Sequence, residues 1–213
     1  MRLDHVSYVT SHNQLADTVQ RLGSRLGITF IDGGVHPRFG TRNFTAALKN
    51  GKYIEVVCPL EHPAAENTAW GKTVSRKAAE GGGWLTWVFN VQDISVIETK
   101  FGRSAIVGHR VRPDGKELKW KQIGVKELME KPELPFFIEW ISEEHPSMDR
   151  NSQVEISEIA IADSSKLAKS WLSGEILESL EGEIGLDLRS HESGEDGIIE
   201  ISFATPHGVI VID

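Results

Sequence analysis

Hydrophobic and polar residues over the first sixty positions form patterns that predict one strand, one helix and then three more strands. Residues 3–10 alternate and are rich in β-branched and aromatic side chains, which is typical of a strand. Apolar residues then recur at helical spacing from Leu15 to Leu26, and Gly27 favours the end of that helix. Short apolar runs predict the remaining strands: 28–31, 41–48 and 53–57.

Two glycine-containing pairs predict the turns between these strands. Gly33 and Gly34 are expected to turn the chain after the strand over residues 28–31. Asn50 and Gly51 are a strong signal for a two-residue hairpin, because both residues readily adopt positive φ.

The same order of elements recurs along the rest of the chain. A partly helical connection is expected over 62–83, and the second unit then follows with its own helix. The strands expected in this unit are 84–91, 106–112, 118–123 and 136–141. A third unit repeats the order in shortened form, with strands expected over 154–162, 186–190, 198–203 and 209–212.

The repetition predicts an α+β fold made of βαβββ units. The divisions that we expect are a first unit, a linker, a second unit and a shortened third unit: 1–62, 63–83, 84–146 and 147–213. The third unit is expected either to pack on the other two or to pair across a homodimer, and we favour the homodimer.

The closing strand of each unit carries an Ile-Glu pair, which places Glu55, Glu139 and Glu200 at equivalent positions. A carboxylate inside an apolar run costs several kcal/mol if it is buried without a partner. It must therefore face a cleft, pair with a cation or bind a metal. For Glu200 we expect no site, because its counterpart on the opening strand is Glu158 rather than a histidine.

Three short segments resemble the vicinal oxygen chelate superfamily in its glyoxalase-like branch. They are an opening strand LDHVSY at 3–8, a closing strand YIEVV at 53–57 and the start of a second unit, FNVQD, at 89–93. The resemblance implies that two units pair and that their sheets curve around a shared cleft. It also implies a divalent metal in that cleft, bound by side chains from the first and fourth strand of each unit.

Carried over residue by residue, the resemblance implies that His5, Glu55 and Glu139 bind the metal. The fourth position is Thr86, and threonine is a poor metal ligand. One nitrogen and two oxygen donors suit Mn²⁺, Fe²⁺, Ni²⁺, Co²⁺ or Zn²⁺. The alternatives are a hydrogen-bonded strand histidine at His5 and ordinary salt bridges at the two glutamates.

The function implied is that of a metal-dependent lyase, isomerase or hydrolase acting on a small oxygenated metabolite. The metal would polarise a carbonyl, and Glu55 or Glu139 would act as the catalytic base. The alternative is a metal-free protein that binds or sequesters a small molecule. Four tryptophans would then line its pocket, although core packing is the simpler interpretation for them: Trp84, Trp87, Trp120 and Trp140.

Two residues between the second and third strands are candidate substrate contacts, together with Thr86. His36 and Arg38 belong to a segment that we expect near the mouth of the cleft. Arg38 suits a substrate carboxylate or phosphate. The alternative for both is an exposed loop position.

Composition and net charge limit the kinds of partner that we expect for this protein. The chain has 213 residues and a net charge of −8, which disfavours nucleic acid as a partner. No apolar run approaches the ~20 residues that span a bilayer, and Cys58 is the single cysteine. We therefore expect a cytoplasmic protein with a small-molecule ligand.

Overall fold

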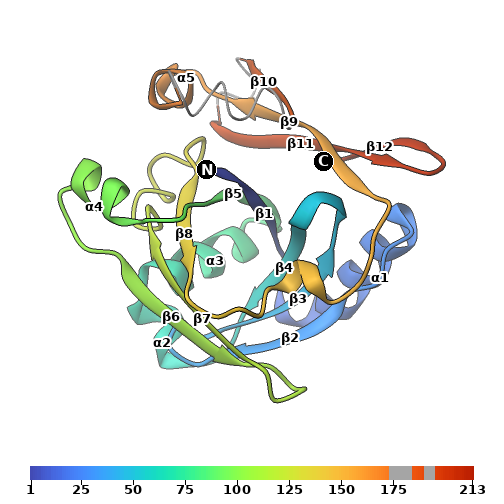
Figure 1. The fold of residues 1–213 in the computed structure, drawn as a ribbon, viewed down its shortest axis with the longest axis horizontal. Helices are drawn as coiled ribbons and strands as arrows, with labels where there is room; N and C mark the ends of the chain where they lie inside the picture. The colour runs from blue at the N-terminus through green and yellow to red at the C-terminus, as the bar shows by residue number, and fades with distance from the viewer. Residues whose placement is uncertain (173–183, 190–194) are drawn as a thin grey trace.

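A computed structural model describes residues 1–172, 184–189 and 195–213 as one curved sheet of eight strands and a second sheet of four (Figure 1). The strands of the large sheet are β1 (Arg2–Val9), β2 (Ile31–His36), β3 (Thr41–Ala47), β4 (Tyr53–Pro59), β5 (Gly83–Asn90), β6 (Ile106–Val111), β7 (Glu117–Ile123) and β8 (Phe136–Trp140). Those of the second sheet are β9 (Glu155–Ala162), β10 (Gly185–Arg189), β11 (Gly197–Thr205) and β12 (Gly208–Ile212). The predicted strand end at Ser190 lies outside the described residues.

Helices connect and cover these sheets. They are α1 (Leu15–Leu26), α2 (Pro63–Asn67), α3 (Ala69–Ala79), α4 (Ser95–Phe101) and α5 (Leu167–Trp171). Both α2 and α3 fall in the connection that was expected to be partly helical, and α3 packs against β4 and β5. No helix in the described part of the chain is long and apolar enough to cross a bilayer.

The order of the large sheet, β2-β3-β4-β1-β5-β8-β7-β6, confirms the predicted fold class. Each half places its four strands in the same sequence outward from the centre. The halves meet where β1 pairs with β5 in the antiparallel direction, and β1 also pairs with β4 in parallel. The edge strands β2 and β6 contact each other, so the sheet nearly closes on itself (Figure 1).

The predicted position of the second strand and of its turn is wrong. β2 spans Ile31–His36, and Gly33 and Gly34 lie inside it rather than in a turn. The register against β3 shifts between Asp32 and Gly34, so the two glycines accommodate a bulge. The chain reverses instead at Gly40, whose φ of 66° is left-handed.

A hairpin turn at Asn50–Gly51 is confirmed, but its loop is longer than the two residues expected. Asn50 has φ 60° and Gly51 has φ 70°, and the turn joins β3 to β4. Ala47 pairs with Tyr53, and the N–H of Leu48 donates to the carbonyl of Lys52, which leaves Lys49 in the loop as well.

The second sheet packs on the large sheet around aromatic side chains. Trp84 on β5 lies 6.2 Å from Phe203 on β11 between ring centroids, and its indole N–H donates to the carbonyl of Ile212 at 2.8 Å. Phe137 on β8 packs on Trp171 of α5 at 5.1 Å. The third unit therefore covers the first two, on the face that lies uppermost in Figure 1. The expected homodimer stays a prediction.

Candidate functional site

A small, partly open cavity lies within the curve of the large sheet. Its polar lining comes from both halves of the sheet: His5, His36, Asn43, Tyr53, Glu55, Arg110 and Gln122. Its apolar walls are mostly aromatic: Phe39, Trp70, Trp120, Phe136, Ile138 and Trp140.

Strand alternation brings His5 and Glu55 to the same cavity. In the parallel pair of β1 and β4, His5 is in register with Tyr53, and Ser7 with Glu55. The His5 ring stacks on Tyr53 with 4.3 Å between centroids, and the Ser7 hydroxyl donates to Glu55 at 2.7 Å. Burial, together with the charges of Asp4 and Glu55, raises the pKa of Tyr53, which therefore keeps its phenolic proton.

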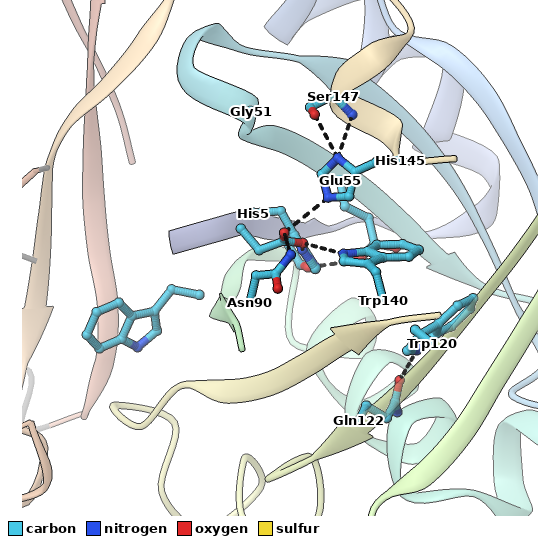
Figure 2. A network of polar contacts seen from close by, with 12 residues as sticks. His5, Gly51, Glu55, Asn90, Trp120, Gln122, Trp140, His145 and Ser147 are labelled. Carbon is cyan, nitrogen blue, oxygen red and sulfur yellow. Dashed lines mark hydrogen bonds and ion pairs between the residues drawn. The ribbon is translucent and has the colours of Figure 1, made fainter. Parts of the chain in front are cut away.

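Asp4 is fully buried, and four side chains lie within hydrogen-bond distance of its carboxylate, with Arg2 in a longer ion pair at 3.7 Å. Figure 2 shows these four side chains, His5, Asn90, Trp140 and His145, close together. The register of β1 against β5 shifts between Leu3 and His5, and this irregularity accompanies the turning of Asp4 toward its neighbour. His5 Nδ1 lies 2.9 Å from the carboxylate, and the other three donors follow at 3.1 to 3.3 Å: His145 Nε2, Asn90 Nδ2 and Trp140 Nε1.

Protonation states within this cluster follow from its donors. Burial by itself would raise the pKa of Asp4, but the hydrogen bonds from His145 and His5 hold it well below its usual range. An ionised carboxylate can only accept, so His5 donates from Nδ1 and its Nε2 is left for the cavity. The backbone N–H of Ser147 donates to His145 Nδ1 at 3.1 Å, so the proton of that ring lies on Nε2.

A second polar chain runs from Glu55 across the seam between β2 and β6. Asn43 donates its amide N–H to Glu55 and accepts from Arg110 through its amide oxygen. Arg110 also donates to His36 Nε2 at 2.9 Å, because a guanidinium has no acceptor. His36 Nδ1 therefore donates to Thr41 at 3.0 Å. Burial and the charge of Arg110 lower the pKa of His36, which is neutral.

Arg110 is the residue that sequence reasoning missed. Its side chain comes from β6, where buried and exposed positions alternate, and it is only 3% exposed. Within the described residues, no carboxylate forms an ion pair with its guanidinium, although the charges of Glu55 and Asp149 act on it, and its Nε has no partner. Burial lowers the pKa of Arg110, yet a guanidinium stays charged at neutral pH. The signal available in the sequence was strand alternation, which places Arg110 on the same face of β6 as Gly108.

Glu139 does not join His5 and Glu55. On β8, the alternate residues Phe136, Ile138 and Trp140 line the cavity. Glu139 lies between Ile138 and Trp140 along the strand, so its side chain points to the other face. Its carboxylate accepts from Lys121 at 2.9 Å and from the backbone N–H of Ile94 at 2.8 Å. The expected convergence of the three residues is therefore wrong, and the salt-bridge alternative describes Glu139.

The remaining candidate residues divide between the cavity and other places. His36 lines the cavity, but both of its ring nitrogens already have partners. Thr86 is fully buried outside the lining, and its hydroxyl donates to the carbonyl of Trp87 at 3.2 Å. Arg38 is exposed beside a neighbouring hollow. Glu200 pairs with Arg189 on the second sheet.

The four tryptophans considered in the sequence analysis divide evenly between wall and core. Trp120 and Trp140 line the cavity, as the pocket interpretation requires, and their ring centroids lie 5.8 Å apart. Trp84 and Trp87 are core residues.

The donors present do not fit the four-ligand metal site that the resemblance implies. Of the four positions, His5 and Glu55 face the cavity, while Thr86 and Glu139 do not. Among the described residues, no group of three or more His, Cys, Asp or Glu side chains is placed to hold a metal ion. Apolar side chains of β8 occupy the opposite wall.

Comparison with known proteins identifies the family. The glyoxalase-like domain family matches residues 3–174. Methylmalonyl-CoA epimerase from Mycobacterium tuberculosis is 16% identical, with a TM-score of 0.44 over 65% of this chain and 85% of its own. A variant of the Streptomyces coelicolor methylmalonyl-CoA epimerase, in complex with 2-nitronate-propionyl-CoA, is 18% identical, with a TM-score of 0.44 over 67% and 99%.

None of the curated proteins compared with the chain matches it. The family match extends over well more than half of the sequence. The chain therefore belongs to the glyoxalase-like domain family of the vicinal oxygen chelate superfamily.

Proposed function

We propose that the protein binds a small, flat organic acid in the cavity, with the carboxylate of the ligand at Arg110. The observation that carries this proposal is a guanidinium buried to 3% exposure beside the cavity, with no ion pair to any described residue and no partner for its Nε. Burial is the largest influence on the pKa of Arg110, and the charges of Glu55 and Asp149 offset it only in part, so an arriving anion is favoured there. A carboxylate also matches the planar fork of arginine.

Glu55 does not meet this need by itself. Asn43 lies between the two charges, accepting from Arg110 and donating to Glu55. The amide holds the glutamate and the arginine apart and fixes both in position. The guanidinium is thereby kept available to a ligand in the cavity.

The walls define the rest of the ligand. Trp70 and Phe136 pack edge to face with 5.7 Å between centroids, and Trp120 and Trp140 form a second pair. Aromatic walls with a few fixed polar groups are typical of pockets for flat apolar ligands. His5 Nε2 and the Tyr53 hydroxyl supply polar contacts on the same wall.

Tryptophan fluorescence tests the proposal with benzoate as the probe. Wild type should bind benzoate, and R110Q should weaken binding by about tenfold or more, because a charge-assisted pair is lost. Arg189→Gln, on the second sheet, is the matched control and should bind as wild type does. Equal benzoate affinity in folded wild type and R110Q would contradict the proposal.

The second candidate function is the metal-dependent lyase or isomerase that the resemblance implies. One observation favours it, because metal-bound histidines usually donate their second ring N–H to a carboxylate, as His5 does to Asp4. Elemental analysis of protein purified without chelator tests it. About one divalent ion per chain, lost in His5→Ala, would support this candidate, and equally low content in both would reject it.

A further inference from the structure

A second hollow adjoins the cavity. The two share three wall residues, Phe39, Trp70 and Gln122. The hollow lies where the start of α3, the end of β7 and the segment after α4 meet, and three cationic side chains line it: Arg38, Arg103 and Lys126. These residues define what we name the basic lobe.

The basic lobe is positively charged, whereas the protein as a whole is negatively charged. No aspartate or glutamate is among the described residues that line it, although the chain carries a net charge of −8. Arg103 is paired with Glu127 at 2.6 Å. Arg38 donates to the carbonyl of Val107 at 2.8 Å, and neither Arg38 nor Lys126 forms an ion pair within the described part of the chain. Two cations of the lobe are therefore available to an anion.

Gln122 supplies a donor between the cavity and the basic lobe. Its side-chain oxygen accepts from the indole N–H of Trp120, a bond drawn in Figure 2. Because an indole nitrogen can only donate, the amide nitrogen of Gln122 is left over. No described residue accepts from it, although Gln122 is only 7% exposed. A ligand that passes from one hollow to the other would meet this donor.

A different hollow, beside β2 and β6, is also lined by arginines, but Asp32 lines it as well. Arg42 pairs with Asp32 there, Arg112 pairs with Asp149 at 2.7 Å, and the third arginine is Arg110, where the carboxylate of the ligand is proposed to bind. Among the described residues, the basic lobe has no acid in its lining and two cations without ion pairs, so it is the better site for a second anion.

We propose that the basic lobe binds an oxyanion tail of the same molecule whose carboxylate reaches Arg110. The ligand class is then a flat acid that carries a second anionic group, a phosphate, phosphonate or carboxylate, on a short linker. This inference rests on the proposed function, because the head of the ligand occupies the cavity. Arg38 and Lys126 provide the charge and Gln122 the contact at the junction.

Two matched probes test the inference: 4-propylbenzoate, and 4-(3-phosphonopropyl)benzoate with the same ring and linker. Wild type should bind the phosphonate about tenfold more tightly, since each charge-assisted contact adds to the affinity. Replacing both free cations, R38A with K126A, should reduce this preference to about twofold or less and leave binding of 4-propylbenzoate unchanged. Lys169→Ala, an exposed cation on α5, should retain the full preference.

The results that would contradict the tail site differ from those that would contradict the head site. Equal affinity of wild type for both probes, or an unchanged preference in the double variant, would overturn the basic lobe as a tail site. R110Q is the test of the head site. If it binds 4-propylbenzoate as tightly as wild type does, the proposed function falls instead.

Discussion

At the scale of single residues, the glutamate of the repeated Ile-Glu pair lies in two different environments. Glu55 and Glu139 occupy equivalent places in their strands, yet Glu55 is held by Ser7 and Asn43 beside the cavity. Glu139 is held by Lys121 and a backbone N–H on the other face of the sheet. Asp4 depends most strongly on its hydrogen-bond partners, because its carboxylate is fully buried.

Asp4 should make stability depend on acid pH. The folded protein holds the pKa of this carboxyl below its ordinary value, through His145 and His5 against the opposing effect of burial. The stabilisation is therefore complete above the unfolded pKa of about 3.9 and is lost as pH falls through the lower folded pKa. D4N should cost about 3 kcal/mol at pH 6 and less at pH 3, measured by urea unfolding.

Asp187→Asn, at a half-exposed position on β10, provides the control. Its pair with Arg189 lies at the surface, so the expected change is under about 1 kcal/mol at either pH. A cost of D4N that is the same at pH 6 and pH 3 would rule out an ionised Asp4.

At the scale of elements, the seam between β2 and β6 positions the arginine. Arg110 reaches across from β6 to His36 on β2 and to Asn43 on β3. Gly33 on β2 makes this approach possible, because a Cβ there would collide with the Asn43 side-chain oxygen and lie 2.9 Å from the Arg110 guanidinium. The bulge in β2 thus leaves room for the site.

Gly33→Ala should therefore disturb the site more than the strand. The added methyl group must displace Asn43 or Arg110, which we expect to cost about 1–3 kcal/mol of stability and to weaken benzoate binding severalfold. Thermal unfolding and fluorescence titration measure the two effects. Val35→Ala, at an exposed position of the same strand, should change stability by less than about 0.5 kcal/mol. Unaltered benzoate binding by Gly33→Ala would contradict this account.

At the scale of the whole molecule, the two sheets share one core. Buried side chains of β1, β5 and β8 form a continuous cluster with those of β9, β11 and β12. Phe203 and Ile212 of the third unit are fully buried within this cluster. The third unit therefore stabilises the large sheet from the face opposite to the cavity walls.

Phe203→Ala should destabilise both sheets together. Removing this fully buried ring should cost about 3–5 kcal/mol. Far-UV circular dichroism and tryptophan fluorescence should still report one shared unfolding midpoint in urea. The exposed Val209→Ala on β12 is the control, with little expected change. Two separate transitions would show that the third unit folds independently.

Much of the architecture was predictable from the sequence, because it depends on local patterns. Alternation, helix-ending glycines and the Asn50–Gly51 turn gave nearly all elements and the repeated order. The failure at Gly33 and Gly34 has a physical cause: glycine pairs suit bulges as well as turns, and pairing with β3 decided between them. The family resemblance implied that His5 and Glu55 share a cleft, and both do line the cavity.

The sequence by itself determined the repeated units and the face that each strand residue takes relative to its neighbours, since both follow from a period of two along the strand. It did not determine which face of β8 turns to the cavity, and so it misplaced Glu139. Only the tertiary structure decided that Arg110 and His36 meet across the seam, 74 residues apart in the chain, and that Asp4 lies among four hydrogen-bond donors. Such contacts depend on sheet curvature and register over long separations, which no local pattern encodes.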